Sequence, residues 1–532
     1  MPDIDRPKEY WGTRLGVIFA VAGSAVGLGN FIRFPGLLAK HGGAFMIPYL
    51  IAFVLLGLPI VFAEWVLGRY GGRRGYNSPP GIFRVASKKP RNFLAYLGMF
   101  GPLIGLTVFM FYVFVEAWCL GYAWKYLTGT MPAASDPSFV TDFANPFIGT
   151  QEGGNGSLFA NPLQNSLIFL VICFALNFFL IYRGLSKGIE IFCKYALPTL
   201  ILCAIVVVIR VLTLPANPDI PHANVLTGLA YMWNPDWNKL SQAQIWIDAA
   251  GQIFFSLSIG FGVIVTYASY LKPDDDIALA SMTAAAGNGF CEVCLGGLMV
   301  IPASVVFLGP QFLQSDAVQN ASNFHLGFVA LPSVFEQMWG GRWFGFFFFF
   351  LLFLAAATSS IAMLQPAIAF LEEALDIGRH ASIAILGFIT VVGAYVVVYY
   401  TENQLALETF DIWMSTVSIY ILATIEVFIF AWALGIKKGR TELDRGAHIH
   451  IPNHVMFIIK YLSPIYLLGI FGFWIYSDII LDNELIQNIT DKYAAQVVIG
   501  VIILTAAFIL LIISEAVRRW HRKEQSLGGS EL

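Results

Sequence analysis

Charged residues are scarce in this sequence: Asp, Glu, Lys and Arg make up only 12% of its 532 residues. An ordinary soluble domain carries about 25%, so most of the chain cannot form a water-exposed surface. The hydrophobic residues, 57% of the total, recur in runs of about 20 residues, the length that crosses the hydrocarbon core of a bilayer. The composition indicates an all-α protein that crosses a membrane many times, and it excludes a mainly soluble one.

The signatures of enzymes and of metal centres are also missing. The six cysteines are scattered, and Cys291 and Cys294 form a CxxC in an apolar segment without a second pair. No GxSxG or HExxH motif and no paired aspartates fall in the glycine-rich apolar segments. These absences argue against an intramembrane enzyme and against a cysteine-based metal or redox centre.

Twelve apolar spans are predicted, each to within a few residues. They cover 15–38, 43–69, 93–127, 164–183, 190–213, 242–271, 277–308, 342–374, 381–400, 404–434, 455–478 and 493–516. Basic residues concentrate in the connections 69–91 and 437–445 and in the tail 518–523. The stretches 128–162 and 310–341 contain no Lys or Arg. Because basic loops stay on the cytoplasmic side, we expect both termini in the cytoplasm, which requires an even number of spans.

A weak internal symmetry divides these spans. Helix-breaking residues interrupt the first span at 23-GSAVGLGN-30 and the sixth at 256-SLSIGFG-262. Since the first five spans begin in the cytoplasm and the next five begin outside, the two groups are predicted to be inverted repeats. The predicted divisions are a cytoplasmic tail (1–14), the first inverted repeat (15–213), an extracellular loop (214–241), the second inverted repeat (242–434, with an extracellular lid at 309–341), two further spans (435–516) and a cytoplasmic tail (517–532).

The interruption of the first span predicts a binding site. A glycine costs about 1 kcal/mol in a helix interior and a proline about 3, and unpaired backbone groups survive in lipid only where protein, water or a ligand pairs them. Freed carbonyls near Gly23, Ala25 and Val26 suit a cation, whereas freed amides at Leu28 and Gly29 suit an anion. A zwitterion therefore fits across this break.

Six segments carry a family resemblance over nearly all of 8–515: WGTRLGVIFAVAGSAVGLGNFIRFP, GGAFMIPY, EWVLGRYGG, GQIFFSLSIGFG, TYASY and TSSIAMLQP. With them the chain resembles the neurotransmitter:sodium symporter family, and especially its short bacterial amino-acid transporters. The resemblance implies the leucine-transporter fold, with twelve transmembrane helices in a 5+5 inverted repeat and with helices 1 and 6 broken.

The resemblance also implies two sodium sites. The first would use Ala25, Asn30, Ser256 and Asn288 together with the substrate carboxylate. The second would use Gly23, Val26, Ala355, Thr358 and Ser359. All-oxygen sites of this kind suit a hard cation. Related transporters have Thr at the position of Ser256, and Ser keeps the oxygen but loses a packing methyl.

The substrate pocket implied by the resemblance lies between the two breaks. Its residues would be Ala25, Gly27, Leu28, Gly29, Val108, Tyr112, Phe255, Ser256, Ser258, Phe261, Ser359 and Met363. Tyr112 would donate to a carboxylate, and Phe255 and Phe261 would close an apolar side-chain pocket. Family members that carry monoamines have an aspartate at the position of Gly27. With Gly27 there, the substrate should bring its own carboxylate, so a neutral, apolar amino acid is expected.

Charged residues within the spans predict gates, because they are costly in a membrane and serve function by default. By resemblance, Arg33 and Asp411 form the extracellular gate together with Gln252 and Tyr112. The cytoplasmic gate would pair Glu373 with Lys8 or, since related transporters have Arg at that position, with Arg6 instead. Trp11 and Tyr270 would support the cytoplasmic gate.

Glu292 follows Asn288 by one helical turn, near the first sodium site. Chloride-dependent relatives have a small polar residue at this position and bind the anion. A carboxylate supplies the negative charge itself, so transport without chloride is expected, and protonation of Glu292 would allow proton counter-transport. The alternative is a carboxylate that serves structure alone, the role expected for Glu64, Glu116 and Glu426.

These residues together predict a secondary active transporter that couples sodium to an amino acid by alternating access, in the plasma or inner membrane. The expected partners are the small-molecule substrate and the bilayer, with no nucleic acid, for a monomer or loose dimer. Two alternatives stay open: a sodium-coupled carrier of a betaine or another amine, and an amino-acid sensor that does not transport.

Overall fold

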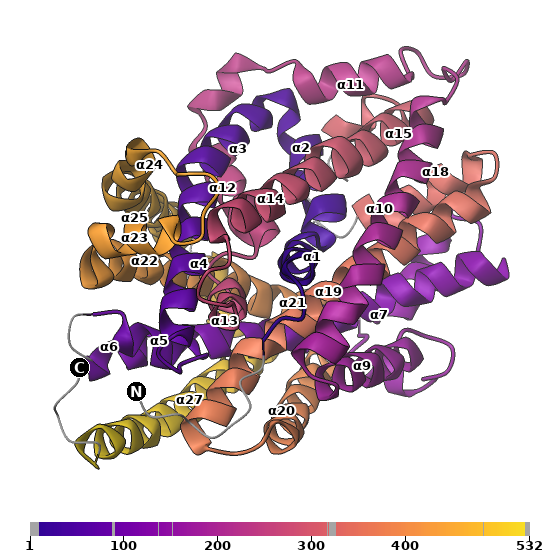
Figure 1. Cartoon of the computed structure of the whole chain (residues 1–532). Coiled ribbons are helices and arrows are strands. Elements are labelled where there is room, and N and C mark those ends of the chain that lie inside the picture. The colour runs from indigo at the N-terminus through magenta and orange to yellow at the C-terminus, as the bar shows by residue number, and fades with distance from the viewer. Residues whose placement is uncertain are drawn as a thin grey trace.

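Helices make up the fold of this chain (Figure 1). The computed structural model describes residues 10–87, 91–136, 138–151, 153–315, 318, 326–481 and 484–526, and no strand occurs among them. Lys8 and Arg6, the residues expected at the cytoplasmic gate, lie outside the described residues.

The first predicted repeat contains the first interruption, which lies between α1 (Arg14–Ala25) and the π-helical η1 (Gly29–Arg33). The further helices of this repeat are α2 (Phe34–His41), α3 (Met46–Ala52), α4 (Leu58–Gly72), α7 (Phe100–Thr128), α9 (Leu167–Tyr182) and α10 (Ile191–Leu212). The short helices α5 (Pro79–Val85) and α6 (Asn92–Leu97) connect α4 to α7, and α11 (Val225–Trp233) precedes the second repeat.

The second predicted repeat and the last two predicted spans also consist of helices. They comprise α12 (Ala243–Leu257), α13 (Val263–Ser269), α14 (Ile277–Gly289), η8 (Phe290–Gly297), α15 (Leu298–Leu308), α19 (Gly341–Leu375), α20 (Arg379–Tyr399), α21 (Leu405–Phe410), η12 (Asp411–Ser418), α22 (Ile419–Phe428), α23 (Ile436–Asp444), α24 (Asn453–Phe457), α25 (Ser463–Trp474), α26 (Glu484–Asp491) and α27 (Tyr493–Ser526). In the predicted lid, the structure describes η9 (Phe312–Gln314), η10 (Leu326–Ala330) and α18 (Leu331–Gln337).

Nine helical segments among the described residues are long and apolar enough to cross a membrane. The predicted spans 15–38, 164–183 and 242–271 have no counterpart of that length. The helices α1 and α9 have 12 and 16 residues, and the residues of the sixth span divide between α12 and α13. The number of membrane-length segments is thus smaller than the twelve predicted spans because three of the predicted spans form short or divided helices.

Two helices form the centre of the molecule. Most residues of α7 and α19 are buried, as expected for helices that are apolar on all sides. Figure 1 shows α1 beside α19, with α14 and α10 on either side. The interrupted segments therefore lie against a packed interior, where polar groups are shielded from lipid.

Candidate functional site

The first interruption lies between α1 and η1. The helix α1 ends at Ala25, and Val26 has a φ of −75° and a ψ of 86°, outside the helical range. The amide of Gly27 donates to Asn30 Oδ1 at 2.9 Å, and the amide of Leu28 donates to Tyr112 Oη at 3.3 Å. Two side chains thus pair amides at the start of the next helix, η1, which have no partner within it.

The second interruption lies between α12 and α13. Three residues there have left-handed backbones, with φ of 54° at Ser258 and 73° at both Gly260 and Gly262. Glycine adopts this conformation without steric cost. The amide of Gly260 donates to Oε1 of Glu64 at 2.6 Å, and Glu64 is fully buried. A buried carboxylate thus fixes the backbone of this interruption.

Both interruptions and α19 meet at a single backbone oxygen. The carbonyl of Ser24 accepts hydrogen bonds from Ser258 Oγ at 2.8 Å and Ser359 Oγ at 3.1 Å. A Cβ atom at Gly27 would lie 2.9 Å from Ser359 Oγ and 3.2 Å from Tyr112 Oη. The structure therefore gathers Gly27, Tyr112, Ser258 and Ser359, four of the predicted substrate residues, around one point.

Aromatic rings lie on one side of this point. Phe255 and Phe261 contact edge to face, with ring centroids 6.3 Å apart, and a Cβ at Gly29 would lie 2.7 Å from the Phe255 ring. The other two predicted lining residues, Val108 and Met363, are buried on α7 and α19. Each lies four residues from Tyr112 or Ser359, respectively, so each shares a helix face with that hydroxyl.

Oxygen atoms converge at the predicted first sodium site. The terminal amide of Asn288 lies 3.0 Å from the carbonyl oxygen of Ala25 and 3.3 Å from that of Ser256. Asn30 Nδ2 lies 2.8 Å from the same amide. With its oxygen toward the carbonyls, Asn288 completes an oxygen cluster that suits a hard cation. With its nitrogen there, it donates to them.

The predicted second sodium site is less fully assembled. Thr358 Oγ1 donates to Leu354 and Ala355 at 3.1 and 3.0 Å, and Ser359 Oγ donates to Ala355 at 3.0 Å. These bonds within α19 leave hydroxyl lone pairs free to bind a cation. A Cβ at Gly23 would lie 3.5 Å from Thr358 Cβ, so α1 contacts α19 at this place.

Glu292 lies next to the first predicted sodium site and is completely buried. Its Oε2 accepts from Tyr49 Oη at 2.6 Å and from Ser256 Oγ at 2.7 Å. Its Oε1 accepts from the side-chain amide of Gln252, which also donates to Gly29 O at 3.1 Å. Three donors on two oxygens pair a buried charge well, and one of them, Ser256, is itself a predicted sodium ligand.

The predicted extracellular gate is only partly assembled. The Arg33 guanidinium lies 4.9 Å from the centre of the Phe255 ring, and its buried Nε has no hydrogen-bond partner among the described residues. Asp411 is the first residue of η12, and its carboxylate interacts electrostatically with the Arg33 guanidinium. Within the described part of the chain, no direct ion pair joins the two side chains.

At the opposite end, the residues of the predicted cytoplasmic gate are engaged in other contacts. Glu373 Oε2 accepts from the amides of Asn77 at 2.8 Å and Ser78 at 3.0 Å. Buried Trp11 donates from Nε1 to the carbonyl of Tyr267 at 3.0 Å. Tyr270 Oη accepts from Gln365 Nε2 at 3.2 Å.

Some contacts could not be anticipated from the sequence. Glu190 caps the start of α1: it accepts from the amides of Gly12 at 2.8 Å and Thr13 at 3.1 Å, and from Thr13 Oγ1 at 2.9 Å. Tyr49 belongs to the GGAFMIPY segment, but nothing in that segment indicates Glu292 as its partner. The sequence shows Glu64 as a charged residue within an apolar span, but it does not indicate that Glu64 binds the amide of Gly260.

The donor chemistry of this region fits an alkali cation. Among the described residues, no group of three or more His, Cys, Asp or Glu could hold a metal ion. The converging groups are instead backbone carbonyls, amide oxygens and hydroxyls, which match a singly charged hard cation better than a transition metal.

Comparisons with known proteins agree with this geometry. The model of the "Sodium:neurotransmitter symporter family" matches residues 8–147 and 162–521. An uncharacterized sodium-dependent transporter of Methanocaldococcus jannaschii is 26% identical over 96% of this chain and 98% of its own. The sodium-dependent serotonin transporter of Drosophila melanogaster is 25% identical over 88% of this chain and 76% of its own. The crystal structure of MhsT in complex with L-phenylalanine superposes with a TM-score of 0.73 at 26% identity, covering 88% of this chain and 99% of MhsT.

The fold and the site thus define a membrane-spanning secondary transporter, not an enzyme. The chain belongs to the sodium:neurotransmitter symporter family, and its transport depends on sodium. The resemblance stated from the six sequence segments is confirmed.

Proposed function

We propose that this protein is a chloride-independent symporter that carries a neutral, apolar amino acid with sodium. The observation that carries the proposal is the junction of the two interruptions around Ser24 and Gly27. Tyr112 Oη accepts the amide of Leu28, which leaves its own hydrogen to donate to a carboxylate. The carbonyl oxygen of Ala25 can accept from an ammonium group. This arrangement suits a zwitterion, and MhsT, solved with L-phenylalanine, supports an amino acid as the substrate class.

Two sodium ions are assigned in this proposal. The first binds among Ala25, Asn30, Ser256 and Asn288. The second binds among Gly23, Val26, Ala355, Thr358 and Ser359. The membrane potential favours each inward positive charge by about 2.3 kcal/mol per 100 mV, so sodium entry can concentrate the substrate.

Transport then proceeds by alternating access. Sodium orders the two interruptions, the substrate completes the first ion's ligand set, and Arg33 and Asp411 approach each other to close the outer side. The twelve crossings, the inverted repeats and the cytoplasmic termini predicted from the sequence belong to this proposal. The sequence pattern and the family support them.

Uptake into vesicles tests the function. Purified protein in liposomes with an inward sodium gradient should accumulate one or more neutral amino acids, and potassium should not replace sodium. Accumulation of a betaine instead would assign the amine alternative. Binding without accumulation would assign the sensor alternative.

Thr358→Ala tests the second ion site against a matched control. Removing one ligand of a charged group costs about 1.5–3 kcal/mol, so sodium affinity in a thermal-shift titration should fall at least tenfold. Thr107→Ala is the control, because Thr107 is also buried and also bonds to its own helix, at 2.7 Å. Equal effects of both substitutions would contradict the ion assignment.

Glu292→Ser tests chloride independence. The wild-type protein should transport at the same rate with chloride or with gluconate, whereas the variant should be stimulated by chloride, because it lacks the resident negative charge. Glu116→Ser is the control: Glu116 is equally buried but binds Ser360 and Asn177. A variant indifferent to chloride would refute the role of Glu292.

A further inference from the structure

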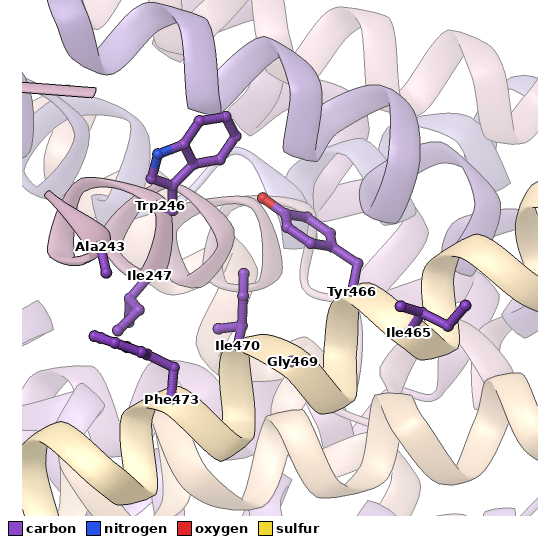
Figure 2. Close-up of a pocket in the computed structure, with 8 residues that line it drawn as sticks. All are labelled: Ala243, Trp246, Ile247, Ile465, Tyr466, Gly469, Ile470 and Phe473. Carbon is purple, nitrogen blue, oxygen red and sulfur yellow. The ribbon is translucent and has the colours of Figure 1, made fainter. Parts of the chain in front are cut away.

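A narrow apolar groove separates α12 from α25, away from the substrate site. Figure 2 shows Trp246 and Ile247 of α12 on one wall and Tyr466, Ile470 and Phe473 of α25 on the other. Its volume is about 280 Å³. The indole nitrogen of Trp246 donates to Leu240 O at 3.0 Å, so this potential polar group in the wall is already paired.

The groove opens onto a surface that faces lipid. Next to it on α25, Ile465 is 68% exposed and Leu468 is 54% exposed, and α25 belongs to a segment apolar enough to cross a membrane. In a membrane transporter such side chains are exposed to hydrocarbon rather than to water. The groove is therefore continuous with the lipid-facing surface.

Neighbouring tryptophans indicate its depth in the membrane. Trp233 and Trp237, which precede α12 in the chain, are 50% and 69% exposed. Exposed tryptophans concentrate at the boundary between lipid and water. The first turn of α12, which forms one wall, thus lies just inside that boundary.

We propose that this groove is a binding site for one acyl chain of a membrane phospholipid, from the leaflet that contains the first turn of α12. The other polar side-chain atom among the lining residues, the hydroxyl oxygen of Tyr466, is buried in the wall, so polar solutes find too few hydrogen-bond partners here. A helix of a second protein copy, about 10–12 Å in diameter, is too wide for a cavity of this volume. An alkyl chain matches the shape, the chemistry and the opening toward lipid.

An acyl chain in this groove contacts α12, the helix that carries two residues of the predicted sites. Trp246 and Ile247 lie roughly one and a half to two and a half turns before Gln252, which binds Glu292, and Phe255, which stacks with Arg33. A chain lodged between α12 and α25 supports the helix that carries these residues. This inference does not depend on the identity of the substrate.

Two glycines of α25 provide a matched pair of variants. A Cβ at Gly469 or at Gly472 would meet no atom within 4 Å, yet Gly469 lines the groove and Gly472 does not. Gly469→Phe should therefore fill the groove, while Gly472→Phe adds the same ring to the neighbouring lipid-facing surface. If thermal melting shows that Gly469→Phe does not fold, Gly469→Leu replaces it.

The experiment uses full-length protein in vesicles that contain phosphatidylcholine with a photoreactive acyl chain. Illumination should label α12 around Trp246 and Ile247 in the wild type and in Gly472→Phe. Labelling should fall about tenfold in Gly469→Phe, as expected when about two methylene groups lose their burial. Equal labelling of α12 in all three proteins, or labelling in the wild type no stronger than that of exposed Phe388 on α20, would overturn the proposal.

A second copy of the chain is the competing occupant. A single cysteine in place of Gly469 would then form a disulfide-linked dimer upon oxidation in vesicles, and this result would overturn the lipid assignment. With lipid as the occupant, Gly469→Cys stays monomeric, and transport by the wild type varies with acyl-chain length more than transport by Gly469→Phe.

Discussion

The two helix interruptions of this protein differ in the residues that hold their backbone where the regular helix stops. Between α12 and α13, the backbone itself is fixed by left-handed residues and by the buried carboxylate of Glu64. Between α1 and η1, the free amides are held by Asn30 and Tyr112, side chains that can exchange these partners for others. The comparison indicates that the backbone of the second interruption is fixed by its own conformation and by a buried carboxylate, whereas the amides of the first are held by side chains that a ligand could replace.

Gly260→Ala should have the largest effect, on stability. A non-glycine residue in the left-handed region costs roughly 1–2 kcal/mol, and the new Cβ would lie 2.6 Å from the carbonyl oxygen of Ile419. The melting temperature in detergent should drop clearly. Gly287→Ala in α14, whose Cβ would meet nothing within 4 Å, should leave it unchanged or raise it. Equal melting temperatures would show that the second interruption is not fixed by its backbone.

Gly27→Ala should spare stability but impair substrate binding. The added methyl would lie 2.9 Å from Ser359 Oγ, which can change rotamer in the free protein, and 3.2 Å from Tyr112 Oη. Overpacking of about 1–3 kcal/mol should weaken amino-acid affinity about tenfold or more in an equilibrium binding assay. If Gly27→Ala instead lowered the melting temperature and kept its affinity, the first interruption would depend on its backbone conformation, contrary to this prediction.

Tyr112→Phe should have a smaller effect on binding. It removes the acceptor of the Leu28 amide and the proposed donor to the substrate, at a cost of about 0.5–1.5 kcal/mol per hydrogen bond. Affinity should fall by up to about tenfold. Tyr126→Phe is the control on the same helix, because its hydroxyl contacts Pro332 O in the lid region at 3.5 Å. The two variants should differ in affinity, and equal affinities would contradict the role of Tyr112.

The smallest effect is expected from the contact between the interruptions. Ser258→Ala and Ser359→Ala each remove one hydrogen bond to the carbonyl of Ser24. A double-mutant cycle on melting free energies should reveal a coupling of about 0.5 kcal/mol or more, because both hydroxyls share one acceptor. Additive effects would mean that the two interruptions are independent.

Much of this architecture could be predicted from the sequence because the membrane leaves few alternatives. Helices must pair their own backbone groups in lipid, so clusters such as GSAVGLGN and SLSIGFG indicated where special residues were needed. The structure places interruptions of regular helix at these clusters. The roles of individual residues in transport stay predictions.

Long-range pairing could not be predicted from spacing alone. The sequence indicates that Glu64, Glu116 and Glu292 are buried, but their partners lie on helices far away in the chain. The expected ion pair between Arg33 and Asp411 depends on the relative tilt of η1 and η12, which no local pattern determines. Glu373 accepts hydrogen bonds from the backbone amides of Asn77 and Ser78, contacts that spacing does not indicate, and its expected partners Lys8 and Arg6 lie outside the described residues.

The capping of α1 by Glu190 has a mechanical consequence. This rod, about 18 Å long at 1.5 Å per residue, is attached at its first turn to one carboxylate and near its last residue to two hydroxyls. It cannot swing about either anchor while the other holds. A displacement at either end of α1 is therefore transmitted along the helix to its other end.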